Sequence, residues 1–208
     1  MKLSFTITLL IIITQVSVAQ LKVLKLSKAD IPKSITYKGH IINAVKYTDK
    51  TGDHIVFTTE TGETPAKKSA TDDGRDAALY AYHYDITGSD QLELSWQTYD
   101  FISDCNVDIK ANYVPGTFAV TDVDNNGIAE VWLVYRTACR GDVSPSEMKI
   151  IMHEADKKYA VRGTSKVKLS EKEYIGGTYT FDAAFKAAPA TFRKYAADTW
   201  KKNIMDTF

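Results

Sequence analysis

The fold is decided first by the stretch IINAVKYTDKTGDHIVFTT, residues 41–59. Its two ends, Ile41–Tyr47 and His54–Thr59, carry the β-branched and aromatic residues that are typical of strands. Between them, Thr48–Asp53 contains Asp and Gly residues, which allow the backbone to reverse direction. The stretch therefore predicts a β-hairpin.

The same arrangement recurs along the rest of the chain. Further runs of strand-forming residues are Leu79–Tyr84, Leu92–Thr98, Thr117–Val120, Glu130–Tyr135 and Met148–His153. Turn-rich segments separate them at 85–90, 122–127 and 154–158. We therefore predict a mainly β protein, a single antiparallel β-rich domain of consecutive hairpins over residues 20–208. A propeller-like arrangement and a sandwich both fit this pattern.

The C-terminal end changes to a helical period. The apolar residues that recur at every fourth position are Phe192, Ala196, Trp200 and Ile204. Basic residues occupy other positions of the helical wheel, so the pattern predicts an amphipathic helix over about 189–205 with its aromatic face packed on the sheet. A shorter helical piece is expected before it at 182–186, with Asp182 as its N-cap.

The composition limits the class of protein. The chain has 208 residues, of which 44% are hydrophobic, and its 26 basic residues equal its 26 acidic ones. This apolar content is enough for the core of one domain. Because a zero formal charge gives no electrostatic attraction to a polyanion, we expect no nucleic-acid partner.

Residues 1–19 have the pattern of a signal peptide. A mostly apolar run, Leu3–Thr14, follows an early lysine, and the small residues Ser17 and Ala19 favour cleavage between Ala19 and Gln20. The run is shorter than the roughly 18 to 20 apolar residues that span a bilayer, and no later segment reaches that length. We therefore predict a periplasmic or secreted protein with no transmembrane segment in the mature chain. The alternative is an uncleaved N-terminal anchor.

The cysteines and histidines bear on bridges and metal sites. Cys105 and Cys139 are the only cysteines, and in an oxidising compartment an even pair is expected to form a disulfide. The four histidines are His40, His54, His83 and His153. They are scattered and none stands at ligand spacing from a cysteine, which argues against zinc. We interpret His83 and His153 as strand-face packing, because nothing in the sequence places a nucleophile within their reach.

One segment has the pattern of a metal-binding loop. Residues 122–130, DVDNNGIAE, match the calcium-loop pattern D-x-D-x-N-G-x-x-E, in which alternate positions face inward. The expected ligands are the side chains of Asp122, Asp124, Asn126 and Glu130 and the carbonyl of Ile128. Such oxygen ligands favour Ca²⁺, in a structural rather than a catalytic role. The same residues also suit an ordinary Asn-Gly hairpin turn without a metal.

The loop differs from an EF-hand. Leu133 stands where an EF-hand has its bidentate glutamate, and the segment leads into a strand instead of a helix. It resembles instead the short calcium loops between strands in integrin-type propeller repeats.

Several stretches together resemble a known family. They are 80–84 (YAYHY), 99–105 (YDFISDC), 126–132 (NGIAEVW), 139–145 (CRGDVSP), 148–152 (MKIIM) and 179–182 (YTFD), with Asp108, Lys110, Trp200 and Asn203. As a set they resemble a secreted single-domain family of Gram-negative bacteria labelled surface polysaccharide biosynthesis protein. The resemblance implies a role in making or displaying lipopolysaccharide or capsule and specifies no reaction. The sequence has no Gly-rich phosphate loop, so we expect no sugar-nucleotide site.

Two classes of function follow. The resemblance favours a non-catalytic accessory or binding protein, with cell-surface polysaccharide or its assembly machinery as the partner. The alternative is a small secreted glycan hydrolase or lyase that uses paired carboxylates. The candidate functional surface lies near the predicted disulfide and comprises Asp104, Asp108, Arg140 and Asp142. We assign no catalytic residue.

Overall fold

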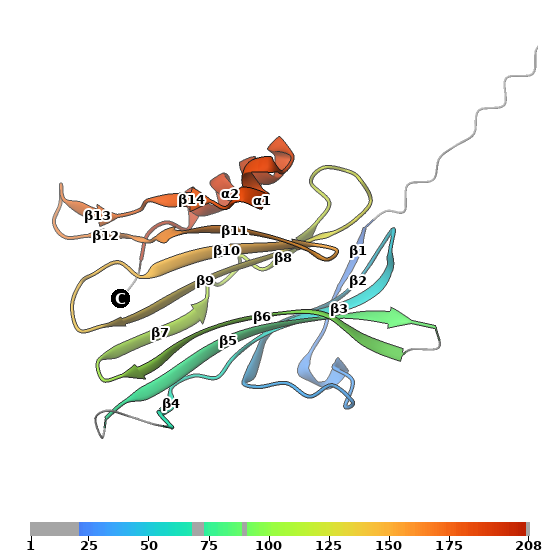
Figure 1. Cartoon of the computed structure of the whole chain (residues 1–208), viewed down its shortest axis with the longest axis horizontal. Coiled ribbons are helices and arrows are strands. Elements are labelled where there is room, and N and C mark those ends of the chain that lie inside the picture. Colours follow the sequence, from blue (N-terminus) through green and yellow to red (C-terminus); the bar gives the residue numbers. More distant parts are fainter. Residues whose placement is uncertain (1–20, 68–72, 89–90, 207–208) are drawn as a thin grey trace, which may run out of the picture.

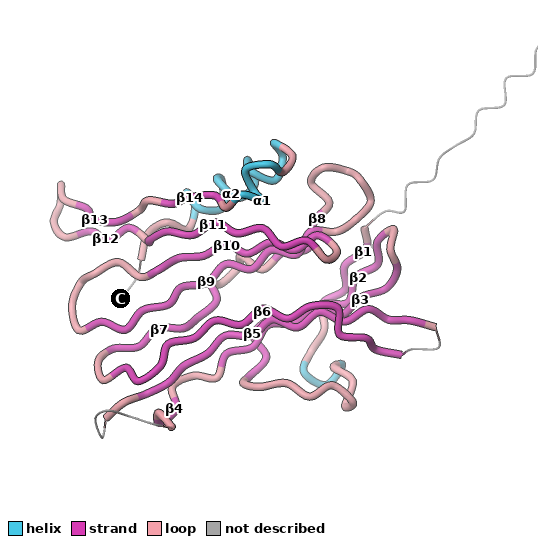
Figure 2. The backbone as a smooth tube through the Cα atoms, viewed as in Figure 1, coloured by secondary structure: helices cyan, strands magenta, loops and turns pink. Residues whose placement is uncertain are grey.

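A computed structural model describes residues 21–67, 73–88 and 91–206 of the protein (Figure 1). The predicted signal peptide lies outside these residues. Strands dominate the described part of the chain, and they pair into antiparallel sheets (Figure 2). The predicted mainly β, antiparallel single domain is therefore confirmed. Within the same residues, no helix is both long and apolar enough to cross a membrane.

The first sheet comes from the N-terminal half of the chain. Its strands are β1 (Lys22–Lys25), β2 (His40–Asp49), β3 (Gly52–Glu60), β4 (Thr64–Pro65), β5 (Arg75–Thr87) and β6 (Gln91–Cys105). They lie in the order β1-β2-β3-β5-β6, with the short β4 beside the first residues of β5. A short 3-10 helix, η1 (Lys28–Asp30), lies between β1 and β2. The hairpin predicted at residues 41–59 is β2 and β3.

The second sheet comes from the C-terminal half. Its strands are β7 (Asp108–Tyr113), β8 (Ala119–Thr121), β9 (Glu130–Arg140), β10 (Glu147–Glu154), β11 (Lys157–Thr164) and β14 (Tyr179–Phe181). They lie in the order β14-β11-β10-β9-β7, with β8 beside the first residues of β9. Two further strands, β12 (Lys166–Lys168) and β13 (Tyr174–Gly176), pair as a separate hairpin.

The two sheets face each other and enclose the main core (Figure 1). Along β9, Val131, Leu133 and Tyr135 join the core between the sheets, while Trp132 and Val134 join the core beneath the helices. Both faces of β9 are buried, which explains its nearly continuous apolar sequence. Of the two arrangements that fit the sequence, the protein adopts the sandwich.

Two helices cover the outer face of the second sheet (Figure 2). The first, α1 (Ala183–Ala187), begins after Asp182, whose carboxylate accepts a hydrogen bond from the Phe185 amide at 2.8 Å. This is the predicted cap, and it satisfies an amide that the first helical turn leaves without a backbone partner.

The second helix, α2 (Ala190–Lys202), carries the predicted apolar stripe. Its fully buried residues are Phe192, Ala196 and Trp200. The helix is shorter than the predicted 189–205, because Pro189 stands at its N-cap and Asn203 at its C-cap. Ile204 lies beyond the helix but still packs against the same apolar cluster.

The predicted disulfide between Cys105 and Cys139 is confirmed. It joins the last residue of β6 to β9 and so connects the first sheet to the second at one end of the sandwich. A bridge that closes a loop of this size stabilises a fold by roughly 3 to 4 kcal/mol.

Candidate functional site

A cavity of about 370 Å³ opens between the two sheets, at the end of the sandwich opposite the disulfide. The first sheet contributes the turn between β2 and β3, the last residues of β5 and the first residues of β6. The second sheet contributes the start of β9 and the turn between β10 and β11. Clefts of this size between packed elements, with a few convergent polar groups, are the usual places for small ligands.

Aromatic rings from both sheets form a continuous row along the cavity. In order, they belong to Tyr47, His54, His83, Trp96 and His153, with neighbouring centroids 4.7, 5.2, 4.9 and 3.8 Å apart. Strand register explains the row within the first sheet, because Tyr47 lies opposite His54 and His83 lies opposite Trp96. The contact of Trp96 with His153 then crosses to β10 of the second sheet.

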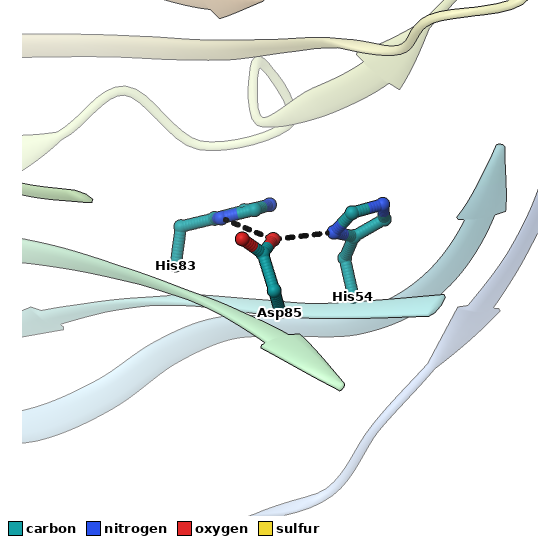
Figure 3. A group of neighbouring side chains, drawn as sticks. All are labelled: His54, His83 and Asp85. Carbon is teal, nitrogen blue, oxygen red and sulfur yellow. Dashed lines mark hydrogen bonds and ion pairs between the residues drawn. The ribbon is translucent and has the colours of Figure 1, made fainter. Parts of the chain in front are cut away.

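His54 is held by polar groups on both sides of its ring. Its Nδ1 lies 2.8 Å from the Asp85 carboxylate, as Figure 3 shows, and its Nε2 lies 3.0 Å from the Thr51 hydroxyl. The same Nε2 is 3.3 Å from the Asp49 carboxylate. His54 is only 6% exposed, so these contacts fix a buried ring.

His83 is held on one side only. Its Nε2 lies 2.6 Å from the Tyr47 hydroxyl, but its Nδ1 has no hydrogen-bond partner among the described residues and lies 3.7 Å from Asp85. Burial, reinforced by the neighbouring His54, lowers the pKa of His83 to about 4. The ring is therefore neutral at pH 7. Burial, with Asp49 and Asp85, also raises the pKa of Tyr47 far above its usual range, so the phenol keeps its proton.

His153 closes the row from the second sheet. Its Nε2 lies 3.0 Å from the Thr98 hydroxyl, and its Nδ1 lacks a hydrogen-bond partner within the part of the chain that the structure describes. Burial, with Lys158 and His83, lowers the pKa of His153 to about 3. Its ring is also neutral at pH 7.

Asp49 connects the cavity to the predicted calcium loop. One carboxylate oxygen accepts hydrogen bonds from the Thr51 amide and hydroxyl, and the other accepts one from the Ala129 amide at 2.8 Å. Burial alone would raise the pKa of Asp49, but these hydrogen bonds outweigh it and lower the pKa. The Lys50 amide also donates to the Gly127 carbonyl. The turn between β2 and β3 thus packs directly on the 122–130 segment.

The structure brings together three of the five predicted calcium ligands. Asp122, Asp124 and Glu130 each offer a carboxylate oxygen, and these oxygens lie within 4.8 Å of one another. Asn126 instead accepts a hydrogen bond from the Ile128 amide and donates to Asp124 and Glu154. Ile128 is one of the residues that line the cavity.

The carboxylates of this loop already accept hydrogen bonds from its backbone. Asp122 accepts from the Asn126 and Gly127 amides, and Glu130 accepts from the Val123 amide and the Thr121 hydroxyl. Burial raises the pKa of Glu130 to about 7, against these hydrogen bonds and with help from Asp124 and Asp122.

The predicted functional surface near the disulfide is divided. Asp108, Arg140 and Asp142 line one surface cavity together with Glu63. Asp104 is not among the described residues that line it, and its amide donates to Asp76. Arg140 contacts the buried carboxylate of Asp206 at 3.1 Å, and Asp142 accepts a hydrogen bond from the Ser144 amide.

Comparison of the chain with protein-family models, with curated proteins and with solved structures finds no match. The sequence did not predict the histidine cavity, in which three of the four scattered histidines lie in one row. One feature of the sequence could have indicated this cavity. Along β5 the polar residues His83 and Asp85 alternate with Tyr82 and Tyr84, so the polar residues share the strand face that lines the cavity.

Proposed function

We propose that this chain is an exported, non-catalytic binding protein that supports the biosynthesis of a bacterial surface polysaccharide, and that its cavity takes a saccharide unit of that polymer. The observation that carries the proposal is the cavity lining, where aromatic rings lie among hydroxyl and carboxylate groups. A sugar ring has C–H faces that suit aromatic rings and hydroxyls that need donors and acceptors. The cavity volume of about 370 Å³ falls within the range of small-ligand pockets.

Trp96 is the fourth ring of the row and the largest aromatic side chain that lines this proposed saccharide site. The rings of His83 and His153 stack on its two faces, so Trp96 meets a ligand in the cavity with its edge. Ser95 contributes a hydroxyl-bearing side chain to the lining, while the hydroxyl of Thr51 is already hydrogen-bonded to Asp49. Carboxylates are strong acceptors for sugar hydroxyls, and the exposed lining residue Asp156 supplies one. The carboxylate of Asp53, also in the lining, is already paired with Thr48 and Lys46.

Two further observations support the proposed export and the proposed polysaccharide partner. The disulfide between Cys105 and Cys139 is typical of proteins in the periplasm or outside the cell. The sequence resemblance to the surface polysaccharide family supports polysaccharide, or its assembly machinery, as the partner.

The alternative function, a glycan hydrolase or lyase, has less support. Glycoside hydrolysis needs one carboxyl group that is held protonated and a second that is held ionised. Hydrogen bonds from Ser144 lower the pKa of Asp142, which is the opposite of what a general acid requires. Arg140 contacts the buried carboxylate of Asp206, which favours a structural role for Arg140.

We also propose that the 122–130 loop holds Ca²⁺ as a structural ion. The close approach of the Asp122, Asp124 and Glu130 carboxylates supports this, because a cation offsets their mutual repulsion. The contact of Asp49 with the Ala129 amide would transmit the order of the loop to the cavity wall.

The saccharide site is tested by calorimetric titration of the purified mature protein with oligosaccharides released from the surface polysaccharide of the source bacterium. Trp96→Ala should weaken binding at least tenfold, which corresponds to about 1.4 kcal/mol. Tyr99→Ala is the matched control, because Tyr99 lies on the same strand but is 51% exposed on the outer face of the sheet. Equal losses in both variants, or no binding by the unaltered protein, would contradict the site. Release of shorter glycans would favour the hydrolase.

The cellular role is tested separately by the lipopolysaccharide and capsule profile of a deletion strain. We expect an altered profile that the unaltered chain restores and the Trp96→Ala variant does not. An unaltered profile would separate the protein from polysaccharide biosynthesis even if the purified chain binds glycans.

A further inference from the structure

We propose that His54, His83 and Asp85 form a binding site for a divalent transition-metal ion, Zn²⁺ by its ligand chemistry, in the wall of the cavity. The proposal goes beyond the saccharide site and does not depend on it. It rests on the convergence of three ligand atoms, on an unpartnered buried ring nitrogen, and on the groups that hold the far side of each ring.

The three side chains converge because of sheet geometry. His54 on β3 lies directly opposite Asp85 on β5, and His83 stands two residues before Asp85 on the same strand face. One ligand atom from each lies within 4.8 Å of the others (Figure 3). Positions on two adjacent, hydrogen-bonded strands keep such a set in place without help from a flexible loop.

The strongest evidence is the Nδ1 atom of His83. The residue is only 3% exposed, and this nitrogen has no hydrogen-bond partner among the residues described. At 3.7 Å from the Asp85 oxygen it is too far for a hydrogen bond, while the His54 Nδ1 already lies 2.8 Å from the same oxygen. A buried polar atom left unpaired costs about 1 to 3 kcal/mol. A metal ion between Asp85 and the two Nδ1 atoms would satisfy all three groups at once.

The far sides of both imidazole rings are held as they are in protein metal sites. A ligating histidine usually donates its other N–H to an oxygen, which fixes the ring and its tautomer. Here the His83 Nε2 faces the Tyr47 hydroxyl at 2.6 Å. The His54 Nε2 faces the Thr51 hydroxyl at 3.0 Å and the Asp49 carboxylate at 3.3 Å. Metal binding requires both Nε2 atoms to act as donors, so that both Nδ1 lone pairs face the ion. The proton that the His54 Nδ1 donates to Asp85 in the metal-free protein would be released when the ion binds.

The ligand set selects the class of metal. Two imidazole nitrogens and one carboxylate suit Zn²⁺ and its neighbours in the transition series, whereas Ca²⁺ prefers an all-oxygen shell. Three protein ligands leave at least one coordination position for water or for a ligand in the cavity. Further carboxylates, those of Asp49, Asp53 and Asp156, also line the cavity and favour a cation there.

The test is a titration of the chelator-treated mature protein with Zn²⁺, followed by calorimetry, and with Co²⁺, followed by its visible absorption. We expect one equivalent of Zn²⁺ bound with micromolar or tighter affinity, and cobalt bands typical of four or five ligands. His83→Ala should weaken binding at least a hundredfold. His40→Ala is the matched control, because His40 is an exposed histidine on β2 that does not line the cavity.

Two further variants keep the proposal falsifiable if His83→Ala fails to fold. Asp85→Asn removes the carboxylate charge, and Tyr47→Phe removes only the oxygen behind His83, for which we expect a 10- to 100-fold weaker affinity. Binding that survives in all three variants, equal loss in His40→Ala, or no stoichiometric binding would overturn the site. Because no saccharide is present and Trp96 is not a ligand, this result and that of the saccharide titration are independent.

Discussion

The two candidate ion sites of this protein are opposites in how they are built. The acidic loop gathers Asp122, Asp124 and Glu130 from one short stretch of chain, while the cavity gathers His54, His83 and Asp85 from two strands. The acidic loop matches a recognisable sequence pattern. The histidine cluster matches none, because its members meet only through strand pairing.

The site that is easier to recognise in the sequence is the one with less need of an ion. The oxygens of Asp122 accept hydrogen bonds from two amides of its own loop, so the turn is a satisfied structure without a metal. The cavity instead leaves the His83 Nδ1 buried without a hydrogen-bond partner among the described residues. A sequence motif thus indicates that a backbone can fold around an ion. The histidine site is supported by a different kind of observation, an unpaired buried nitrogen that lies beside two other ligand atoms.

The largest expected effect is the stabilisation of the fold by each metal ion, which should be lost separately in variants of the two sites. In thermal melts of metal-free protein, Ca²⁺ at a hundred times its dissociation constant should stabilise the fold by about 2.7 kcal/mol, and so should Zn²⁺. Asp124→Asn should abolish the calcium shift and leave the zinc shift. His83→Ala should do the reverse.

Each variant serves as the control for the other in this experiment. If the midpoint of thermal unfolding stays unchanged when calcium and then chelator is added, the 122–130 loop is not a calcium site. If one variant abolished both shifts, the two sites would be coupled and not independent.

A second prediction concerns acid sensitivity, which should come from the cavity. The pKa of His153 falls from an ordinary 6.5 to about 3 in the folded protein, so the unfolded chain takes up the proton first. The stability that the neutral ring contributes is complete above pH 6.5 and is lost as the pH falls. At pH 5 the loss attributable to His153 is about 2 kcal/mol.

The measurement is urea unfolding of metal-free protein at pH 7 and pH 5. His153→Gln should reduce the acid loss by about 2 kcal/mol, because glutamine does not titrate. The comparison must be made between variants, since Glu130, with its pKa raised to about 7, changes stability in the opposite direction over this range. An identical acid loss in both proteins would show that the His153 ring is not held neutral by burial.

The fold was largely predictable because its main signals are local. The hairpin of β2 and β3 and the helical stripe ending in Trp200 follow from nearby residues, and the cysteine pair follows from the predicted export. Three strands of the second sheet were not predicted, namely β7, β11 and the three-residue β14. The sequence of β7, DIKANY, has few strand-forming residues, and β11 begins with the lysines that were assigned to the 154–158 turn. β7 becomes a regular strand by pairing with β9, and β11 by pairing with β10.

The cavity could not be predicted because it depends on contacts between distant parts of the chain. The position of His54 opposite Asp85 requires the exact register of β3 with β5. The approach of His153 to Trp96 requires the packing of one sheet on the other. The separation of the histidines along the sequence therefore does not predict how close they lie in the folded protein.

The smallest expected effect tests whether the loop acts locally. Gly127 has a φ of +84°, which favours glycine, and an added Cβ would lie 3.4 Å from Lys50 atoms. Gly127→Ala should cost about 1 kcal/mol of stability through the backbone alone. Gly116→Ala is the matched control, since Gly116 has a φ of +72° and nothing described lies within 4 Å of an added Cβ.

Both variants should show similar losses in urea unfolding, but only Gly127→Ala should weaken the calcium shift. Neither should change zinc binding, and a loss of zinc affinity in Gly127→Ala would mean that the contact between the loop and the turn of β2 and β3 couples the two sites.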